Sequence, residues 1–546
     1  MKLSERIEKN LLNYLKARTH TGTELERNNE VFFENWIQSV PYFKDHPEYY
    51  GLHEIENDHL KRKSTWALLK GKGSKTIVMI HHTDTVDVDD YGIYKEYAYD
   101  PYELEKLFKQ DNVEMDEVSR KDLYSDKWLF GRGVSDMKGG GAITYSLIEE
   151  YAEDEEFNGN ILILGVPDEE NLSAGMRSAI YLLKELKEKH NLEYVLMLNV
   201  EPHEKVKEQN ITIYDGSVGK IMPIFMVRGK LAHVGQIYRG FNPINLLSEI
   251  IRKTELNPDF IEKAGNTVTP APAWLYFKDR KDVYDVSLPI TAGGYMSILT
   301  LTKSPKDILE QLKHISEEAF KQVIEDMEVS YNKYKSLSNM DYGVFDWKVN
   351  VKYYGEIYNE ILAEKGEKFR TEISQYQKDI EEQIKNNEIS RVEGAYELIE
   401  KTLEYYSDLS PLVVIALAPP YYPSTNNSML KHADEINELI ANIDKFANDE
   451  LNLRVYTQNY YTGISDLSYG LFTEDNENID YISENTIFWG DMYYIPLDII
   501  REISMPVLNV GPWGRDLHKY TERVYKKDLF NSIPKLIDYI VKSILS

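Results

Sequence analysis

Short apolar runs rich in β-branched residues alternate along this chain with longer stretches in which apolar residues recur at helical spacing. The clearest apolar runs cover residues 76–80, 161–166, 194–200 and 506–510. Runs of this length, bounded by polar or turn residues, predict buried strands. Residues 1–40 predict two helices separated by a polar turn at 19–24. Strands that alternate with helices favour an α/β fold with a mostly parallel sheet and flanking helices.

The pattern changes in the middle of the chain, where strand-like pieces flank a helical region. Residues 268–277 and 287–301 predict strands, and an apolar run at 412–418 leads out of this region. We therefore expect an inserted α+β domain between the two parts of one catalytic domain. The predicted boundaries are 1–216 for the first part of the catalytic domain, 217–425 for the inserted domain and 426–546 for the second part.

A helical addition to the inserted domain is predicted at about residues 330–410. Apolar residues recur there at spacings of three and four, in one set at 369–384 and in another at 392–406. This periodicity predicts two amphipathic helices that turn near residues 386–387. Packing within a helical bundle is the simpler interpretation of the two apolar stripes, and a partner-binding surface is the alternative.

Composition and charge exclude several functional classes. The 546 residues include 63 Lys and Arg against 91 Asp and Glu, and the net charge of −28 repels nucleic acid and anionic membranes. No cysteine is present, which excludes disulfides, cysteine zinc fingers, iron–sulfur clusters and thiol nucleophiles. The first residues lack the apolar core of a signal peptide, and no apolar run is long enough to cross a bilayer. We expect a cytoplasmic protein that binds neither nucleic acid nor membranes.

Histidine and carboxylate side chains follow the predicted strands, at the point where each strand ends. The residues concerned are His82 and Asp84, Asp168 to Glu170, Glu201 and, shortly after the last run, His518. In open α/β sheets, ligands bind beyond the carboxyl ends of the strands. Segments that are far apart in the sequence are therefore expected to converge at one edge of the sheet.

Each of these motifs has a plainer interpretation when it stands alone. His82 with Asp84 is also typical of a structural pair, and the acidic run at 168–170 of a solvated turn. Asp136 lies in a glycine-rich segment, residues 131–141, that precedes a helical pattern. Such a junction is typical of a phosphate-binding loop or of a tight turn, but neither GxxxxGK[ST] nor GxGxxG occurs in it.

Taken together, the motifs offer two imidazoles and three carboxylates. If one carboxylate bridges two metal ions, each ion has a His, the shared Asp and a Glu, with positions left for water and substrate. This set suits two zinc ions, with manganese and cobalt as the alternatives. Because Glu169 is adjacent to Glu170, one carboxylate can bind metal while the other accepts a proton from water, as hydrolysis requires.

Five motifs resemble, in the same order, those of the zinc-dependent exopeptidase and deacylase family. That family includes acetylornithine deacetylase, succinyl-diaminopimelate desuccinylase, aminoacylase and glutamate carboxypeptidase. The motifs are HTDTVD at 82–87, GRGVSDMKGG at 131–140, PDEEN at 167–171, VEP at 200–202 and GPWGRDLHKYTE at 511–522. The resemblance implies a phosphorylase/hydrolase-like catalytic domain with a dinuclear centre. Its implied ligands are His82, Asp136 as the bridge, Glu170, Glu201 and His518, while Asp84 would orient His82 and Glu169 would be the general base.

The inserted domain begins with a motif, residues 227–233 followed by 240–243, that resembles the start of the lid domain in this family. The resemblance implies that His233 polarises the scissile carbonyl oxygen from the partner subunit of a homodimer formed through the lid. Asn242 and Arg515 are predicted to bind substrate, and a surface arginine is the alternative for Arg515. The enlarged lid and the overall length are similar to arginine-utilisation proteins of the RocB type.

The resulting prediction is a dinuclear metal-dependent hydrolase of amide bonds. Its expected substrate is an N-acyl amino acid or a short peptide with a free carboxylate, used in amino-acid metabolism, with arginine utilisation as one candidate pathway. One alternative is a catalytically silent family member that acts as a metal-containing binding or regulatory protein, but such a protein has no need of a general base at Glu169. A phosphoester hydrolase is the other alternative, and only Lys138 and Arg515 are available to neutralise its phosphate.

Overall fold

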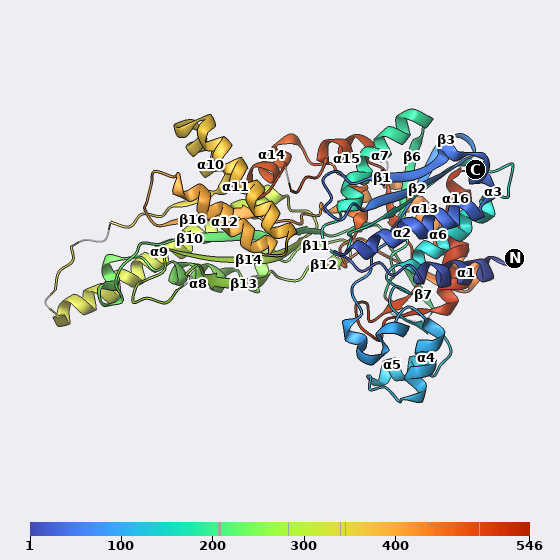
Figure 1. Cartoon of the computed structure of the whole chain (residues 1–546), viewed down its shortest axis with the longest axis horizontal. Helices are drawn as coiled ribbons and strands as arrows, with labels where there is room; N and C mark the ends of the chain where they lie inside the picture. The colour runs from blue at the N-terminus through green and yellow to red at the C-terminus, as the bar shows by residue number, and fades with distance from the viewer. Residues whose placement is uncertain are drawn as a thin grey trace.

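The chain forms two lobes in the computed structural model (Figure 1). The structure describes residues 1–205, 209–281, 283–338, 340–343, 346–431, 433–490 and 492–545. The larger lobe contains both chain termini, and the smaller lobe extends away from it as an elongated body of strands and helices (Figure 1). The smaller lobe is formed by the middle of the sequence, as the predicted insertion requires.

An eight-stranded sheet forms the centre of the larger lobe, with the strand order β1-β2-β5-β3-β6-β19-β7-β18. The four adjacent strands β5, β3, β6 and β19 are all parallel, so their carboxyl ends lie at one edge. The bounds are β1 (Tyr50–Glu54), β2 (Lys63–Lys70), β3 (Lys72–His82), β5 (Asn158–Val166), β6 (Glu193–Asn199), β7 (Asn210–Tyr214), β18 (Arg454–Gln458) and β19 (Val507–Asn509). The predicted mostly parallel sheet is confirmed.

Helices cover both faces of this sheet because its central strands are apolar on both faces. Along β3, Ile77 and Met79 belong to one hydrophobic core, and Val78 and Ile80 belong to another. A strand that alternates between two cores has its side chains buried on both sides, which is typical of parallel sheets. Helices on the first face are α1 (Leu3–Leu15), α2 (Asn28–Ser39), α6 (Lys138–Tyr151), α13 (Ala433–Leu451) and α16 (Ile533–Leu545), and those on the second are α7 (Ala174–His190) and α15 (Leu497–Ile503).

A three-stranded antiparallel sheet, in the order β20-β21-β4, lies next to the large sheet. It joins β4 (Trp128–Phe130) to β20 (Gly514–Arg515) and β21 (Arg523–Tyr525). The segment between β3 and β4 contains α4 (Pro101–Gln110) and α5 (Glu117–Leu123), which project from the larger lobe (Figure 1). This small sheet brings the last part of the chain against the segment that precedes α6.

The inserted lobe has its own sheet, in the order β13-β14-β10-β16-β15, with β9 paired to β14. Phe225 and Val227 of β10 pack on one face of it, and Ile224 and Met226 on the other. The helices α8 (Pro243–Thr254) and α9 (Pro305–Ser338) cover the first face, and α10 (Tyr354–Lys365), α11 (Glu367–Lys385) and α12 (Arg391–Glu404) cover the second. The strands are β9 (Gly219–Ile221), β10 (Pro223–Arg228), β13 (Ala273–Asp279), β14 (Thr291–Thr300), β15 (Val351–Tyr353) and β16 (Leu412–Leu417).

The predicted helical hairpin corresponds to α11 and α12, and Asn387 between them has a left-handed φ of 58°. Their apolar stripes lie in the core of the inserted lobe, which agrees with bundle packing. The exact domain boundaries stay a prediction. One helix after residue 425, α14 (Asn476–Asn485), contacts α9, α10 and β16, so the second part of the catalytic sequence also contributes to the inserted lobe.

Candidate metal centre

The ends of the three central strands place imidazole and carboxylate groups side by side. His82 is the last residue of β3 and pairs with Val166, the last residue of β5. Glu169 and Glu170 follow β5 within four residues, and Glu201 follows β6 within two. Because β5, β3 and β6 are adjacent and parallel, these side chains converge at one edge, as the sequence predicts.

Asp136 lies at the centre of the group and faces a different imidazole with each carboxylate oxygen. Its Oδ1 is 2.9 Å from His82 Nε2, and its Oδ2 is 3.1 Å from His518 Nε2. His518 Nε2 is also 3.1 Å from Glu170 Oε1, and His82 Nε2 is 3.6 Å from Glu201 Oε1. The five predicted ligands thus form two sets of a His and a Glu, which share Asp136.

This donor set fits a pair of divalent metal ions. Ligand atoms of His82, Asp136 and Glu170 all lie within 4.8 Å of one another. Imidazole nitrogens and carboxylate oxygens are ordinary zinc ligands and are also accepted by manganese and cobalt. With Asp136 as the shared ligand, His82 and Glu201 would hold one ion, and His518 and Glu170 would hold the other.

The small sheet positions Asp136 and His518 together. Asp136 follows β4, and His518 lies between β20 and β21. The buried Glu522 carboxylate accepts hydrogen bonds from the main-chain N–H groups of Ser135 and Asp136, each at 3.2 Å, and from Arg132 Nη1 at 2.7 Å. Burial raises the pKa of Glu522 to about 7, and Arg132 opposes this shift. Glu522 was not predicted from the sequence as a functional residue.

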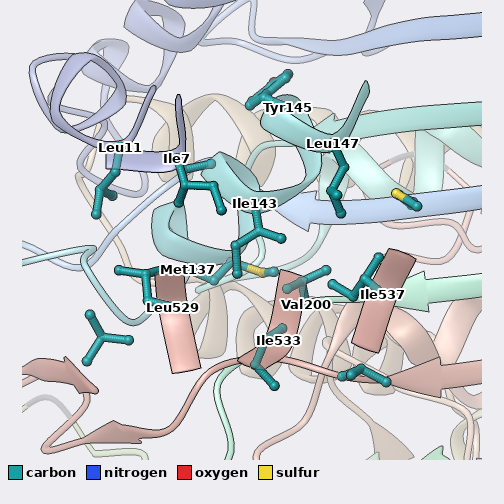
Figure 2. Close-up of a cluster of buried hydrophobic side chains, with 14 of the residues drawn as sticks. Ile7, Leu11, Met137, Ile143, Tyr145, Leu147, Val200, Leu529, Ile533 and Ile537 are labelled. Atoms are coloured by element: carbon teal, nitrogen blue, oxygen red, sulfur yellow. The ribbon is translucent and has the colours of Figure 1, made fainter. Parts of the chain in front are cut away.

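Residues next to two of the ligands are anchored in the hydrophobic core. Met137 follows Asp136, Val200 precedes Glu201, and both side chains lie beside Ile143 and Ile533 in the packed cluster of Figure 2. Met137 and Val200 are fully buried. The ligands therefore project from a rigid base, which limits the reorganisation that metal binding requires.

Asp84 has a different contact from the one expected. His82 Nδ1 is 3.0 Å from the main-chain oxygen of Asp84 but 3.7 Å from its carboxylate Oδ1, so the main chain orients the imidazole. The carboxylate instead accepts the main-chain N–H groups of Glu169 at 3.1 Å and Glu170 at 3.2 Å. The prediction that the Asp84 carboxylate orients His82 is thereby corrected. The carboxylate fixes the loop that carries Glu169 and Glu170.

Glu169 lies beside the ligand set, and no described residue forms a hydrogen bond or ion pair with its carboxylate. Burial raises the pKa of Glu169 well above its ordinary value, and the positive charge of His82 opposes this shift. The negative charges of Glu170 and Glu201 act in the same direction as burial. A carboxylate without a partner among the described residues, next to the five predicted metal ligands, is placed to exchange a proton with water or substrate.

A buried network of ion pairs supports the loop that carries Glu169 and Glu170. Arg62 Nη1 is 2.6 Å from Asp168 Oδ1 and 2.8 Å from Glu26 Oε1, and all three side chains are almost fully buried. Glu26 Oε2 also accepts the main-chain N–H of Asp168 at 2.9 Å. Asp168 has a left-handed φ of 74°, a conformation that costs energy for a residue with a side chain. The network offsets that cost and fixes the residue before Glu169.

Asp466, another residue that sequence reasoning missed, brings a further carboxylate to the centre. It is 3% exposed. Burial raises the pKa of Asp466 to about 7, while a hydrogen bond with Ser173 and the charge of His82 oppose this shift. No metal-ligand spacing relates Asp466 to the other motifs, so its sequence position offers no signal.

The other three predicted residues have contacts elsewhere. His233 is exposed in the inserted lobe, where its Nδ1 accepts the Gly235 N–H at 3.0 Å. Asn242 caps α8 by accepting the Ile244 N–H at 3.0 Å. Arg515 pairs with Asp122 at 2.7 Å and lies 4.4 Å from the ring centre of Trp513. Among the described residues, no hydrogen bond or ion pair joins these three to the metal-ligand set, and their roles stay predictions.

Sequence comparisons relate the chain to known hydrolases. Residues 109–542 match the family described as Peptidase family M20/M25/M40. Protein YqjN of Bacillus subtilis (strain 168) is 31% identical over 513 residues, 93% of this chain and 91% of that protein. Protein RocB of the same organism is 29% identical over 547 residues, 98% and 94% of the two chains. Succinyl-diaminopimelate desuccinylase of Nitrosospira multiformis is 28% identical over 148 residues, 27% of this chain and 37% of that enzyme.

Solved structures share the fold. A tripeptidase from Staphylococcus aureus subsp. aureus Mu50 superposes with a TM-score of 0.53 at 13% identity, over 99% of this chain and 98% of that one. The Bacillus subtilis YXEP protein, described as a dinuclear metal binding peptidase from the M20 family, gives 0.51 at 10% identity, over 100% and 98%. None of the helices in the described ranges is long and apolar enough to cross a membrane.

Proposed function

The chain belongs to peptidase family M20/M25/M40, whose members are metallohydrolases of amide bonds, and from this premise we propose that it hydrolyses an N-acyl amino acid or a short peptide at a centre of two zinc ions. The single observation that carries the proposal is the position of Asp136 between two sets of ligands, His82 with Glu201 and His518 with Glu170. Manganese and cobalt are the alternative ions.

The ions, when bound, would acidify a shared water and polarise the scissile carbonyl group. Glu169 would take a proton from the attacking water through its carboxylate oxygen and deliver it to the nitrogen of the leaving amine. Asp84 supports this step, because its carboxylate holds the main-chain N–H of Glu169 and so fixes the residue that moves the proton. The His82 ring is held by the contact of its Nδ1 with the main-chain oxygen of Asp84, which leaves Nε2 for a metal ion.

The inserted lobe would complete the site from a second subunit. His233 is exposed, so its imidazole is available to a partner molecule. The edge strand β13 exposes Leu275 and Phe277, which are 56% and 45% accessible, and an unpaired strand edge with apolar side chains favours association. These features support a homodimer through the lid, in which His233 stabilises the oxyanion of the opposite site, with Asn242 and Arg515 as further substrate contacts.

The substrate class is supported by the names of the relatives. Succinyl-diaminopimelate desuccinylase acts on an N-acyl amino acid, and a tripeptidase acts on a short peptide. We propose a role in the use of amino acids, including arginine, in the cytoplasm, and the match to Protein RocB along nearly the whole chain agrees with the RocB-type resemblance of the sequence. A catalytically silent binding or regulatory protein is the competing function, and the unpartnered Glu169 beside a complete ligand set argues against it.

The decisive experiment compares wild type with Glu169→Gln on a panel of N-acetyl amino acids, N-succinyl amino acids and dipeptides. Released amine and bound metal are both measured after loading with zinc, cobalt or manganese. Wild type should bind two ions and turn over part of the panel, and the variant should keep both ions while its turnover falls about 10²- to 10⁴-fold. A wild type that binds two ions and hydrolyses nothing would instead favour the silent binding protein.

A further inference from the structure

Lys220 lies where the chain crosses between the two lobes. It is the central residue of β9, the first strand of the inserted lobe, and it pairs with Tyr422, where the chain returns from that lobe. The Lys220 N–H donates to the Tyr422 oxygen at 2.9 Å, and the Tyr422 N–H donates to the Lys220 oxygen at 3.0 Å. The main chain at Lys220 is thus fixed at the junction, independently of its side chain.

The strand register directs the Lys220 side chain out of the core of the inserted lobe. Its neighbour Ile221 is opposite Ile298, and both belong to that core. Lys220 is opposite Leu299, which packs on the other face beside Val218. Ile464 joins this second group, so the face of the sheet with Lys220 is directed toward the segment that leads to Ser465 and Asp466.

That face borders the metal centre at two points. Ser465 Oγ accepts a hydrogen bond from Asn199 Nδ2 at 2.8 Å, at the end of the strand that leads to Glu201. The Tyr422 and Ser173 hydroxyl oxygens are 3.0 Å apart, and Ser173 N–H donates to the main-chain oxygen of Asp168 at 2.7 Å. The second contact places the strand pair of Lys220 against the loop that carries Glu169.

The Lys220 ammonium is partly buried and has no ionic partner. Among the described residues, no hydrogen bond, ion pair or ring contact to this ammonium is present. Burial lowers the pKa of Lys220, and the Glu169 carboxylate is the charged group that opposes the shift. An ammonium withdrawn from water without a partner is unfavourable, and a ligand with a negative charge would relieve that cost.

We infer that Lys220 binds the carboxylate of the substrate and makes a free carboxylate a requirement for efficient turnover. The inference rests on the proposed function, because the amino-acid part of an N-acyl amino acid has its carboxylate one carbon from the scissile nitrogen. The proton-transferring Glu169 must lie near that nitrogen, and the strand pair of Lys220 and Tyr422 packs against the loop that carries Glu169. The carboxylates of the ligand set would face the metal ions, so they do not compete for the ammonium.

The test uses the N-acetyl amino acids of the panel and their C-terminal primary amides, which differ only in charge at the carboxyl group. Lys220→Met should lower kcat/KM for the acids about 10- to 100-fold, mainly through KM, and leave the amides unchanged. Lys220→Arg should retain the preference for the acids. Lys263→Met, on the exposed strand β11 (Lys263–Ala264) of the same lobe, is the matched control.

Binding of the same acids and amides to the zinc-loaded Glu169→Gln protein, measured by calorimetry, gives a readout that does not need turnover. Adding Lys220→Met to that protein should remove the preference for acid over amide. Equal losses for acids and amides, or an unchanged preference, would overturn the inference while leaving the hydrolase intact. Turnover of no compound by wild type, with no binding of any acid, would overturn both the inference and the proposed function.

Discussion

The Glu522 carboxylate accepts a hydrogen bond from the main-chain N–H of Asp136 at 3.2 Å, across 386 positions of sequence. The Glu522 carboxylate also forms an ion pair with the buried Arg132, whose Nη1 lies 2.7 Å from Glu522 Oε2. Glu522→Gln should therefore lower metal affinity or activity about 10- to 100-fold, which is the usual effect of removing a residue that positions a metal ligand. Calorimetric titration of the metal-free protein with zinc checks this effect.

The same substitution also leaves the Arg132 charge without its nearest partner, which destabilises the fold for a separate reason. The double variant Glu522→Gln with Arg132→Met separates the two effects. It should regain part of the stability to urea while its zinc affinity stays low. Recovery of zinc affinity in the double variant would show that Glu522 acts through Arg132 and does not position Asp136.

Asp84→Asn tests the corrected role of this carboxylate. An amide has one acceptor oxygen in place of two, so it cannot hold the N–H groups of both Glu169 and Glu170. We expect kcat to fall about 10- to 100-fold, and zinc affinity to fall less, because the His82 imidazole contacts the Asp84 main chain. Exposed Asp87→Asn is the control. A loss of zinc affinity larger than the loss of kcat would restore the original expectation that the carboxylate orients His82.

Mixed dimers test whether His233 serves the opposite subunit. His233→Ala and Glu169→Gln should each be nearly inactive as pure proteins. Dissociating and reassociating them in equal amounts should recover about a quarter of wild-type activity, because half of the molecules are mixed and each of these has one intact site. Sedimentation analysis establishes the dimer. If the mixture stays inactive although mixed dimers form, His233 does not complete the site of its partner.

Asp215 makes stability depend on pH. It is 6% exposed, accepts a hydrogen bond from Asn427 Nδ2 at 2.5 Å, and has a pKa that burial raises to about 6. A carboxyl group with a higher pKa in the folded state favours folding at pH below about 4, and this contribution is lost as pH rises through about 6. The free energy of unfolding of Asp215→Asn should equal that of wild type near pH 4. Near pH 7 it should be larger than that of wild type by up to about 3 kcal/mol. Urea unfolding at several pH values checks this, and a difference independent of pH would contradict it.

The central sheet and the convergence of the predicted ligands at its edge could be anticipated because both depend on local sequence patterns. Apolar runs identified the strands β3, β5 and β6, and the rule that parallel strands end at one edge brought His82, Glu170 and Glu201 together. The helical hairpin of the inserted lobe followed from periodicity in the same way. Each of these inferences needs only the order of residues within one segment.

The supporting contacts could not be predicted because they join distant segments through loop geometry. Glu522 reaches Asp136 only because β21 pairs with β4, and a strand of three residues has little pattern of its own. The direction of the Asp84 carboxylate depends on the path of the main chain after Asp168, whose left-handed φ is unusual for an aspartate. Lys220 and Asp466 are single charges without a spacing relation to the motifs.

The pairing of β21 with β4 also affects when the protein can acquire metal during its synthesis. Asp136 is synthesised long before its Glu522 support and the predicted ligand His518, which follow it by 386 and 382 positions. A nascent chain can fold its central strands and still lack one complete ligand set. The second ligand set is therefore completed only after residue 518 has been synthesised and β21 has paired with β4.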